Sequence, residues 1–201
     1  EQYSFLTPQE SRFYLISNQL FTGRHRLDHR GSFMLIKLFG LFKVAGANGK
    51  EMEQSELVTY FNDLCLLAPG ALPFAPVKWE PIDALTVKGT INAFGRTATA
   101  TLHFDQAGDL IDFKSNDRYA TANGKNPQKF PWSTPVHDYR ERNGLRHPTR
   151  AEAIWHMPDG DFEYARFVID SIRFNLSETH FPHPQSTKAY KLKTEIENIL
   201  P

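Results

Sequence analysis

Histidine and cysteine are the first residues to consider for chemistry, because both are common ligands of transition metals. His25 and His29 are four residues apart, and His180 and His183 form a second close pair. The first pair lies in a stretch that looks extended, where residues four apart are about 13 Å from each other. The second pair has no further candidate ligand nearby in the sequence. The single cysteine, Cys65, excludes an internal disulfide and a cysteine-based metal cluster. We therefore predict that no transition metal is bound stoichiometrically.

Motifs of nucleophilic or phosphate chemistry are absent. The sequence contains neither Gly-x-Ser-x-Gly nor a glycine-rich phosphate loop. His137 and Asp138 are adjacent in "HDYRER", but neighbours on a strand point to opposite faces and cannot act as base and orienting partner. Cys65 lies beside the apolar face of a predicted helix, which is typical of an inert core thiol. We predict no cofactor and no catalytic residues.

Arg118 is a candidate for binding an anion. In "NDRY", Asp117 and Tyr119 share one face of an extended chain, and Arg118 takes the other. Its guanidinium could hold the anionic head group of a ligand. The alternative is an ordinary surface or structural ion pair. His156, in "WHMPDGDF", is either a polar group in a cavity or a structural histidine with satisfied hydrogen bonds.

The elements that must position these residues begin with an apolar stretch, "GSFMLIKLFGLFKVAG" at residues 31–46. It is too short for a membrane helix, which needs about 20 apolar residues. Its apolar residues leave no polar helical face, and Gly40 is unfavourable inside a helix. We predict two strands, at about 32–39 and 41–45. A strand with two apolar faces is either core or has one face toward a ligand.

Turn signals divide much of the remaining chain into strands. Asn-Gly and Asp-Gly pairs and the sequence "DQAGD" favour the positive φ angles of tight hairpins. The runs of strand length between the turns are "VKWEPID", "ALTVKGTINAF", "TATATLHF", "LIDFKSNDRY", "EAIWHM" and "DFEYARFVIDSIRFN". Such a succession predicts an antiparallel sheet of more than about six strands.

One amphipathic helix is predicted at about residues 52–67. Leu57, Phe61 and Leu64 fall on one apolar face, and Pro69 ends the helix. The sheet must cover this face, so we predict an α+β fold, mainly antiparallel β. In it, a curved sheet or half-barrel packs on one or two helices.

The chain is predicted to contain a single β-rich domain at residues 1–178. Residues 179–201 are predicted to form a linker and a C-terminal helical extension, with a weaker helix at 187–200. The sequence "THFPHPQS" is the expected linker.

Composition excludes some classes of function. With 201 residues, of which 40% are hydrophobic, the chain can bury a sizeable core. Basic and acidic residues number 23 each and form no basic run, so we predict no nucleic-acid partner. The chain begins at Glu1 rather than Met, so we expect that an upstream segment has been removed. We expect a location outside the cytoplasm, either in the periplasm or anchored to a membrane. In the second case the missing N-terminal segment would hold the protein near the membrane.

The order of several motifs resembles an uncharacterised bacterial family, a domain of unknown function. These motifs, over roughly residues 31–175, are "GSFMLIKLFGLFKVA", "GKEMEQSELVTYFNDL", "VKWEPID", "HFDQAGDLIDFKSNDRY", "PWS" and "DYRERNGLRHPTRAEAIWHMPDGDFEYARFVIDSI". The resemblance implies no known chemistry. Where a Glu is expected in the helix, this chain has Asn62 and Asp63. More remotely, the order of elements is similar to the lipoprotein carriers of the LolA and LolB type. Those are half-barrels closed by helices around an apolar cavity.

Our hypothesis is a non-enzymatic binding module for an apolar or amphipathic, lipid-like ligand, held in a hydrophobic cavity between the curved sheet and the helix. One alternative is a hydrolase-like or other enzyme that uses polar groups of the same cavity, such as His156, Asp117 or Arg118. Another is a structural or partner-binding domain with a solid core. The predicted ligand-binding residues are Leu35, Phe39, Phe61, Trp79, Arg118, Trp132, Trp155 and His156.

Overall fold

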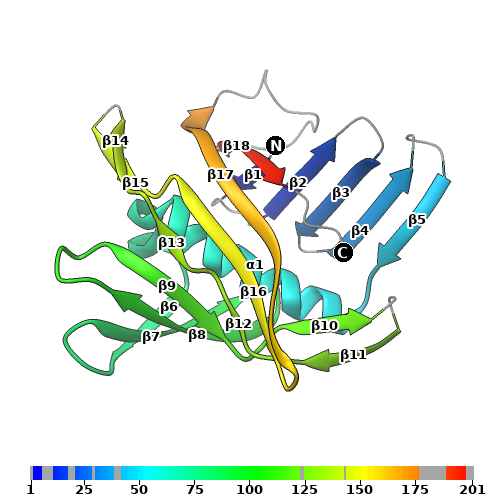
Figure 1. Cartoon of the computed structure of the whole chain (residues 1–201), viewed down its shortest axis with the longest axis horizontal. Helices are drawn as coiled ribbons and strands as arrows, with labels where there is room; N and C mark the ends of the chain where they lie inside the picture. The colour runs from blue at the N-terminus through cyan, green and yellow to red at the C-terminus, as the bar shows by residue number, and fades with distance from the viewer. Residues whose placement is uncertain are drawn as a thin grey trace.

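The computed structural model shows strands arranged around one long helix (Figure 1). It describes residues 2–5, 11–17, 21–28, 30–38, 42–122, 125–142, 144–176 and 189–197. The first strands are β1 (Gln2–Phe5), β2 (Ser11–Ser17), β3 (Phe21–Asp28), β4 (Gly31–Leu38) and β5 (Phe42–Ala47). They are followed by the helix α1 (Lys50–Leu67) and the short 3-10 helix η1 (Pro69–Phe74).

The second half of the chain is almost entirely β. Its longer strands are β6 (Val77–Pro81), β7 (Thr86–Ala93), β8 (Arg96–Phe104), β9 (Leu110–Ser115), β16 (Arg150–Met157), β17 (Gly160–Leu176) and β18 (Ala189–Glu197). The shorter strands are β10 (Tyr119–Ala122), β11 (Lys125–Lys129), β12 (Trp132–Ser133), β13 (Val136–His137), β14 (Arg140–Arg142) and β15 (Leu145–His147).

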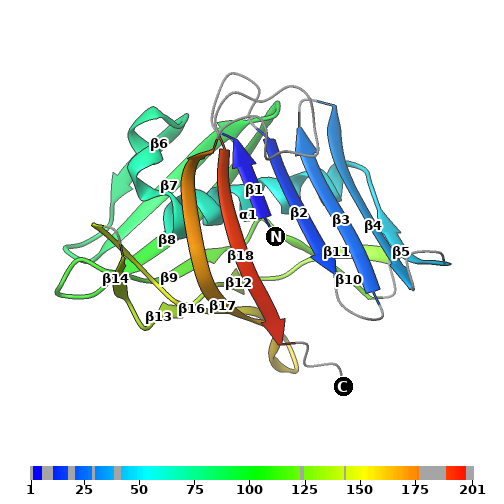
Figure 2. The same cartoon turned by 90° about the horizontal axis from the view of Figure 1, so that it is seen from above.

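One sheet of 14 strands contains most of these elements. Its order is β5-β4-β3-β2-β1-β18-β17-β16-β12-β9-β8-β7-β6, with β13 paired to β16. The pairs along this path are antiparallel. Seen from above, the sheet curves around α1 (Figure 2). The helix contacts β3 and β4 in one arm of the sheet and β8 and β9 in the other. The predicted α+β fold with a curved antiparallel sheet is confirmed.

The predicted helix is also confirmed, and its apolar face is the centre of the core. Leu57 and Phe61 are 0% exposed, and Leu64 is 1% exposed. The β7 strand approaches this face closely. A Cβ added to Gly89 would lie only 2.6 Å from ring atoms of Phe61 and Trp79, so glycine is required there for the close contact.

The hairpin predicted at "DQAGD" is confirmed. The two strands that flank "DQAGD" are β8 and β9, which pair directly. The apolar stretch near the N-terminus forms β4 and β5, which also pair. The connection between those two strands lies outside the described residues.

The predicted C-terminal helix is wrong. Residues 189–197 form the strand β18, which pairs with β1 on one side and with β17 on the other. In "KLKTEIE", Leu192, Thr194 and Ile196 alternate with charged residues, so the sequence also has the period of two that is typical of a strand. Pairing with two neighbouring strands then outweighs the weak helical pattern. The predicted linker at 179–186 lies outside the described residues.

Candidate functional site

Arg118 lies among aromatic side chains that come from three different strands. Its guanidinium carbon is 4.3 Å from the ring centroid of Trp132 on β12 and 5.2 Å from that of Trp155 on β16. Tyr164 on β17 accepts hydrogen bonds from Arg118 Nη1 at 2.7 Å and from the indole Nε1 of Trp132 at 3.2 Å. We call these four residues the Arg118 cluster. Its rings stabilise the guanidinium by cation–π contact.

The Arg118 cluster is rich in hydrogen-bond donors and lacks a matching anion. The hydroxyl of Tyr164 receives two donors, and its own hydrogen has no acceptor among the described residues. Arg118 Nε is buried and without a hydrogen-bond partner. Within the described part of the chain, no carboxylate forms an ion pair with Arg118. A buried donor left unpaired costs about 1–3 kcal/mol, which a bound anion would recover.

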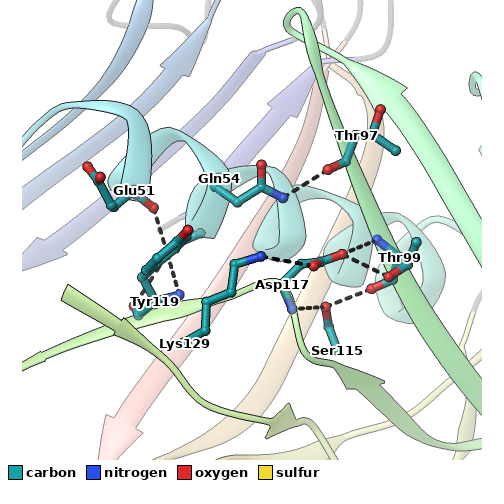
Figure 3. A network of polar contacts seen from close by, with 9 residues as sticks. Glu51, Gln54, Thr97, Thr99, Ser115, Asp117, Tyr119 and Lys129 are labelled. Carbon is teal, nitrogen blue, oxygen red and sulfur yellow. Dashed lines mark hydrogen bonds and ion pairs between the residues drawn. The ribbon is translucent and has the colours of Figure 1, made fainter.

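Both chain neighbours of Arg118 are fixed by hydrogen bonds, as Figure 3 shows. The Oδ2 atom of Asp117 accepts hydrogen bonds from the backbone N–H and the hydroxyl of Thr99, each at 2.8 Å. The backbone N–H of Tyr119 donates to the hydroxyl of Ser55 on α1 at 2.9 Å. Because the chain is held to β8 on one side of Arg118 and to α1 on the other, the direction of the Arg118 side chain is fixed.

The same network shifts the pKa of Asp117. Burial raises this pKa, but hydrogen bonds from Thr99 and Lys129 and the charge of Lys129 lower it more, so the net pKa lies below its ordinary value. The Lys129 ammonium lies 3.3 Å from Asp117 Oδ1. Asp117 is therefore ionised at neutral pH, and its charge is satisfied by groups other than Arg118.

Aromatic rings continue from the Arg118 cluster to the helix. The ring centroids of Trp132 and Phe113 are 6.2 Å apart, those of Phe113 and Phe61 are 5.4 Å apart, and those of Phe61 and Trp79 are 5.9 Å apart. The structure thus brings five of the predicted ligand-binding residues into one continuous row of contacts. Phe61 and Phe113 are 0% exposed, so this end of the row is solid core.

The two predicted residues of the N-terminal stretch lie elsewhere. Leu35 is half-buried on β4, in the opposite arm of the sheet. Phe39 lies outside the described residues. On the same strand Phe33 is 41% exposed, so the prediction of two buried faces holds only in part for β4.

His156 belongs to a different constellation, a hydrogen-bonded chain of Ser, His and Asp. Its Nδ1 lies 2.7 Å from Asp161 Oδ1, and its Nε2 lies 2.8 Å from Ser133 Oγ. A carboxylate only accepts hydrogen bonds, so Nδ1 carries the hydrogen and, in the neutral ring, Nε2 accepts from the serine. Trp132 and Trp155 are directly paired across β12 and β16, so the next residues, Ser133 and His156, project from the opposite face of the sheet.

This arrangement resembles a hydrolytic triad in its distances but lacks the surroundings of one. Ser133 is 1% exposed, and its backbone is paired with β9 on one side and β16 on the other. A substrate would have no access to the hydroxyl, and a strand paired on both sides supplies no oxyanion hole. The two hydrogen bonds of His156 instead connect the β16–β17 turn to β12. This agrees with the interpretation of His156 as a structural histidine.

Three residues of these two constellations, Tyr164, Ser133 and Asp161, were not predicted. Tyr164 shares its strand parity with other aromatic residues of β17, and that parity places it on the face of Trp155, with which it stacks at 6.1 Å. The sequence signal for Tyr164 was therefore present. No signal links Ser133 to Asp161, because their proximity depends on the pairing of β12 with β16.

The described residues contain no group of three or more His, Cys, Asp or Glu side chains that could hold a metal ion. His25 instead lies 3.5 Å from Glu56, and His29, His180 and His183 lie outside the described residues. The absence of a stoichiometric metal therefore stays a prediction. In the same part of the chain, no helix is both long enough and apolar enough to cross a membrane.

Comparison with known proteins gives one match. The family described as "Family of unknown function (DUF6544)" matches residues 1–167. No curated protein matches the chain. No solved structure matches it either, so the likeness to lipoprotein carriers stays a prediction.

Proposed function

The chain belongs to this family of unknown function, DUF6544, and from the geometry of the Arg118 cluster we propose that it binds an amphipathic molecule with an anionic head group. A carboxylate or phosphate pairs with Arg118, and the apolar part of the ligand lies against the aromatic interior between the curved sheet and α1. The protein holds this ligand without transforming it.

The observation that carries the proposal is the unpaired charge of Arg118. A cation enclosed by aromatic rings is desolvated, and the absence of a carboxylate partner among the described residues leaves its charge available. Arginine offers a planar fork of donors that matches carboxylate and phosphate oxygens. The Tyr164 hydroxyl adjoins the guanidinium and can donate to the same anion.

The alternatives have less support. An enzyme in the same interior would need free acid–base groups, but Asp117 is bound to Thr99 and Lys129, and His156 projects from the opposite face of the sheet. A structural domain with a solid core would agree with the buried rings of Phe61 and Phe113. It would leave the unpaired donors of the Arg118 cluster unexplained. The fold analogy to lipoprotein carriers is consistent with a lipid-like ligand.

The test compares two ligands that share an apolar chain and differ in the head group. Oleate and oleyl alcohol are titrated against the protein, and binding is followed by the intrinsic fluorescence of its three tryptophans, two of which, Trp132 and Trp155, belong to the Arg118 cluster. We expect oleate to bind saturably and at least tenfold more tightly than the alcohol, since a charge-assisted hydrogen bond contributes about 1.5–3 kcal/mol. Dodecyl phosphate tests whether phosphate serves as well as carboxylate.

Arg118→Gln should reduce oleate affinity by about tenfold or more and leave affinity for the alcohol unchanged. Arg118→Lys keeps the charge but loses the planar fork, so it should show an intermediate affinity. The matched control is Arg146→Gln, which removes another arginine that stacks on a tyrosine, Tyr139, at 5.3 Å. If neither ligand binds saturably, or if Arg146→Gln lowers oleate affinity as much as Arg118→Gln, the proposal fails.

A further inference from the structure

A second site lies at the C-terminal end of α1, and it shares only the strand β17 with the Arg118 cluster. It is a pocket of about 300 Å³ between the helix end, β15 and β17. Its lining includes Leu67, Leu145, Arg146, His147 and Ile172. Most of this surface is apolar, and the volume is at the lower end of the range for small-molecule sites.

His147 supplies the pocket with one distinctive polar group. The residue is only 8% exposed, and its Nδ1 lies 2.9 Å from the carbonyl oxygen of Pro148. A carbonyl only accepts, so Nδ1 carries the hydrogen and donates it. The other ring nitrogen, Nε2, has no hydrogen-bond partner among the described residues. In the neutral ring that nitrogen is an acceptor. It is not among the buried side-chain atoms that lack a partner, so a donor can reach it.

The charged groups around the pocket do not favour an anion. Arg146 donates from Nε and Nη2 to the two carboxylate oxygens of Asp109, at 2.9 and 2.5 Å, so its charge is already compensated. The last turn of α1 contains no basic residue, and the carbonyl end of a helix carries a partial negative charge. A ligand here should be uncharged and should bring a hydrogen-bond donor.

We infer that this pocket binds a small uncharged molecule with an apolar body and one hydroxyl group, in the class of phenols and short alcohols. The hydroxyl donates to His147 Nε2, and the apolar body contacts Leu67, Leu145 and Ile172. The site and its ligand class differ from those of the Arg118 cluster, so the inference does not depend on the proposed function.

The test uses 4-methylphenol and toluene, which differ by one hydroxyl group. Calorimetric or NMR titration of the full chain should show saturable binding of 4-methylphenol, about fivefold tighter than that of toluene, as expected for one neutral hydrogen bond. His147→Phe should remove this preference while toluene still binds. Leu145 is 47% exposed, so Leu145→Arg can be tolerated by the fold and should block both ligands.

The matched control is Ile111→Arg, at another exposed apolar residue that does not line the pocket. It should leave both affinities unchanged. Failure of 4-methylphenol to bind saturably, equal binding of both compounds to the wild type, or binding that survives Leu145→Arg would each overturn the inference. If His147→Phe does not fold, the comparison of Leu145→Arg with Ile111→Arg still decides whether the pocket is the site.

Discussion

The orientation of a side chain in this protein depends on the hydrogen bonds of its neighbours in the chain as well as on its own contacts. Arg118 is the clearest case, because Asp117 and Tyr119 are fixed to β8 and α1 and thereby aim the residue between them. The Asp117 carboxylate is the centre of this arrangement, since it binds both the backbone and the hydroxyl of Thr99. The position of Arg118 therefore depends on residues whose own side chains do not contact its guanidinium.

Asp117 should make the stability of the protein dependent on pH. Its pKa is lowered in the folded state, so its stabilising contribution is complete above the ordinary aspartate pKa, about 3.9. That contribution is lost as the pH falls below this value toward the folded-state pKa. Asp117→Asn should lower the free energy of unfolding by about 1–2 kcal/mol at pH 7. The variant should also show a smaller further loss between pH 5 and pH 3, measured by urea denaturation.

The control for Asp117→Asn is Glu80→Gln, which removes a carboxylate from an ion pair with Lys78 whose side chains are 46% and 75% exposed. Such exposed pairs contribute little, so this variant should follow the pH dependence of the wild type. A pH profile of Asp117→Asn that runs parallel to that of the wild type would contradict the assigned role of Asp117.

At the scale of elements, local patterns predicted correctly the pieces that depend on near neighbours in the chain. The β8–β9 hairpin followed from "DQAGD", and α1 followed from the spacing of Leu57, Phe61 and Leu64. The C-terminal strand could not be predicted in this way, because β18 is stabilised by pairing with β1, which lies at the other end of the chain. The prediction of the Arg118 cluster is limited in the same way. Most of its members were predicted as ligand-binding residues, but the contacts between them depend on the order of the strands in the sheet.

The packing of α1 against β7 provides a prediction at this scale. Gly89→Ala would place a Cβ 2.6 Å from ring atoms of Phe61 and Trp79, and Phe61 is fully buried and has no room to move. Overpacking of this kind costs about 1–3 kcal/mol. Thermal or urea unfolding should show a loss of stability in that range. Gly70→Ala is the control, since no atom lies within 4 Å of its added Cβ, and it should unfold like the wild type.

At the scale of the whole molecule, the sheet is continuous because β18 lies between β1 and β17. The arm formed by β1–β5 reaches the rest of the sheet through this strand, while α1 contacts both arms from the inside (Figure 2). The curvature of the sheet around the helix therefore depends on a strand formed near the C-terminus. A helical extension, as first predicted from the sequence, would instead be dispensable for the curvature of the sheet.

Removing residues 177–201 tests whether the C-terminal segment joins the two arms of the sheet or is a dispensable extension. Without β18, the edges of β1 and β17 would expose unpaired backbone N–H and C=O groups, and exposed edges pair with other chains. We expect the truncated protein to form dimers or larger aggregates in size-exclusion chromatography with light scattering, and to unfold at a lower urea concentration. A full-length variant with Leu192→Pro should behave similarly, because Leu192 is paired with Gln2 of β1 and with Ile172 of β17, and proline disrupts a strand paired on both sides. A truncated chain that stays monomeric and as stable as the full chain would show that β18 is not needed to join the two arms.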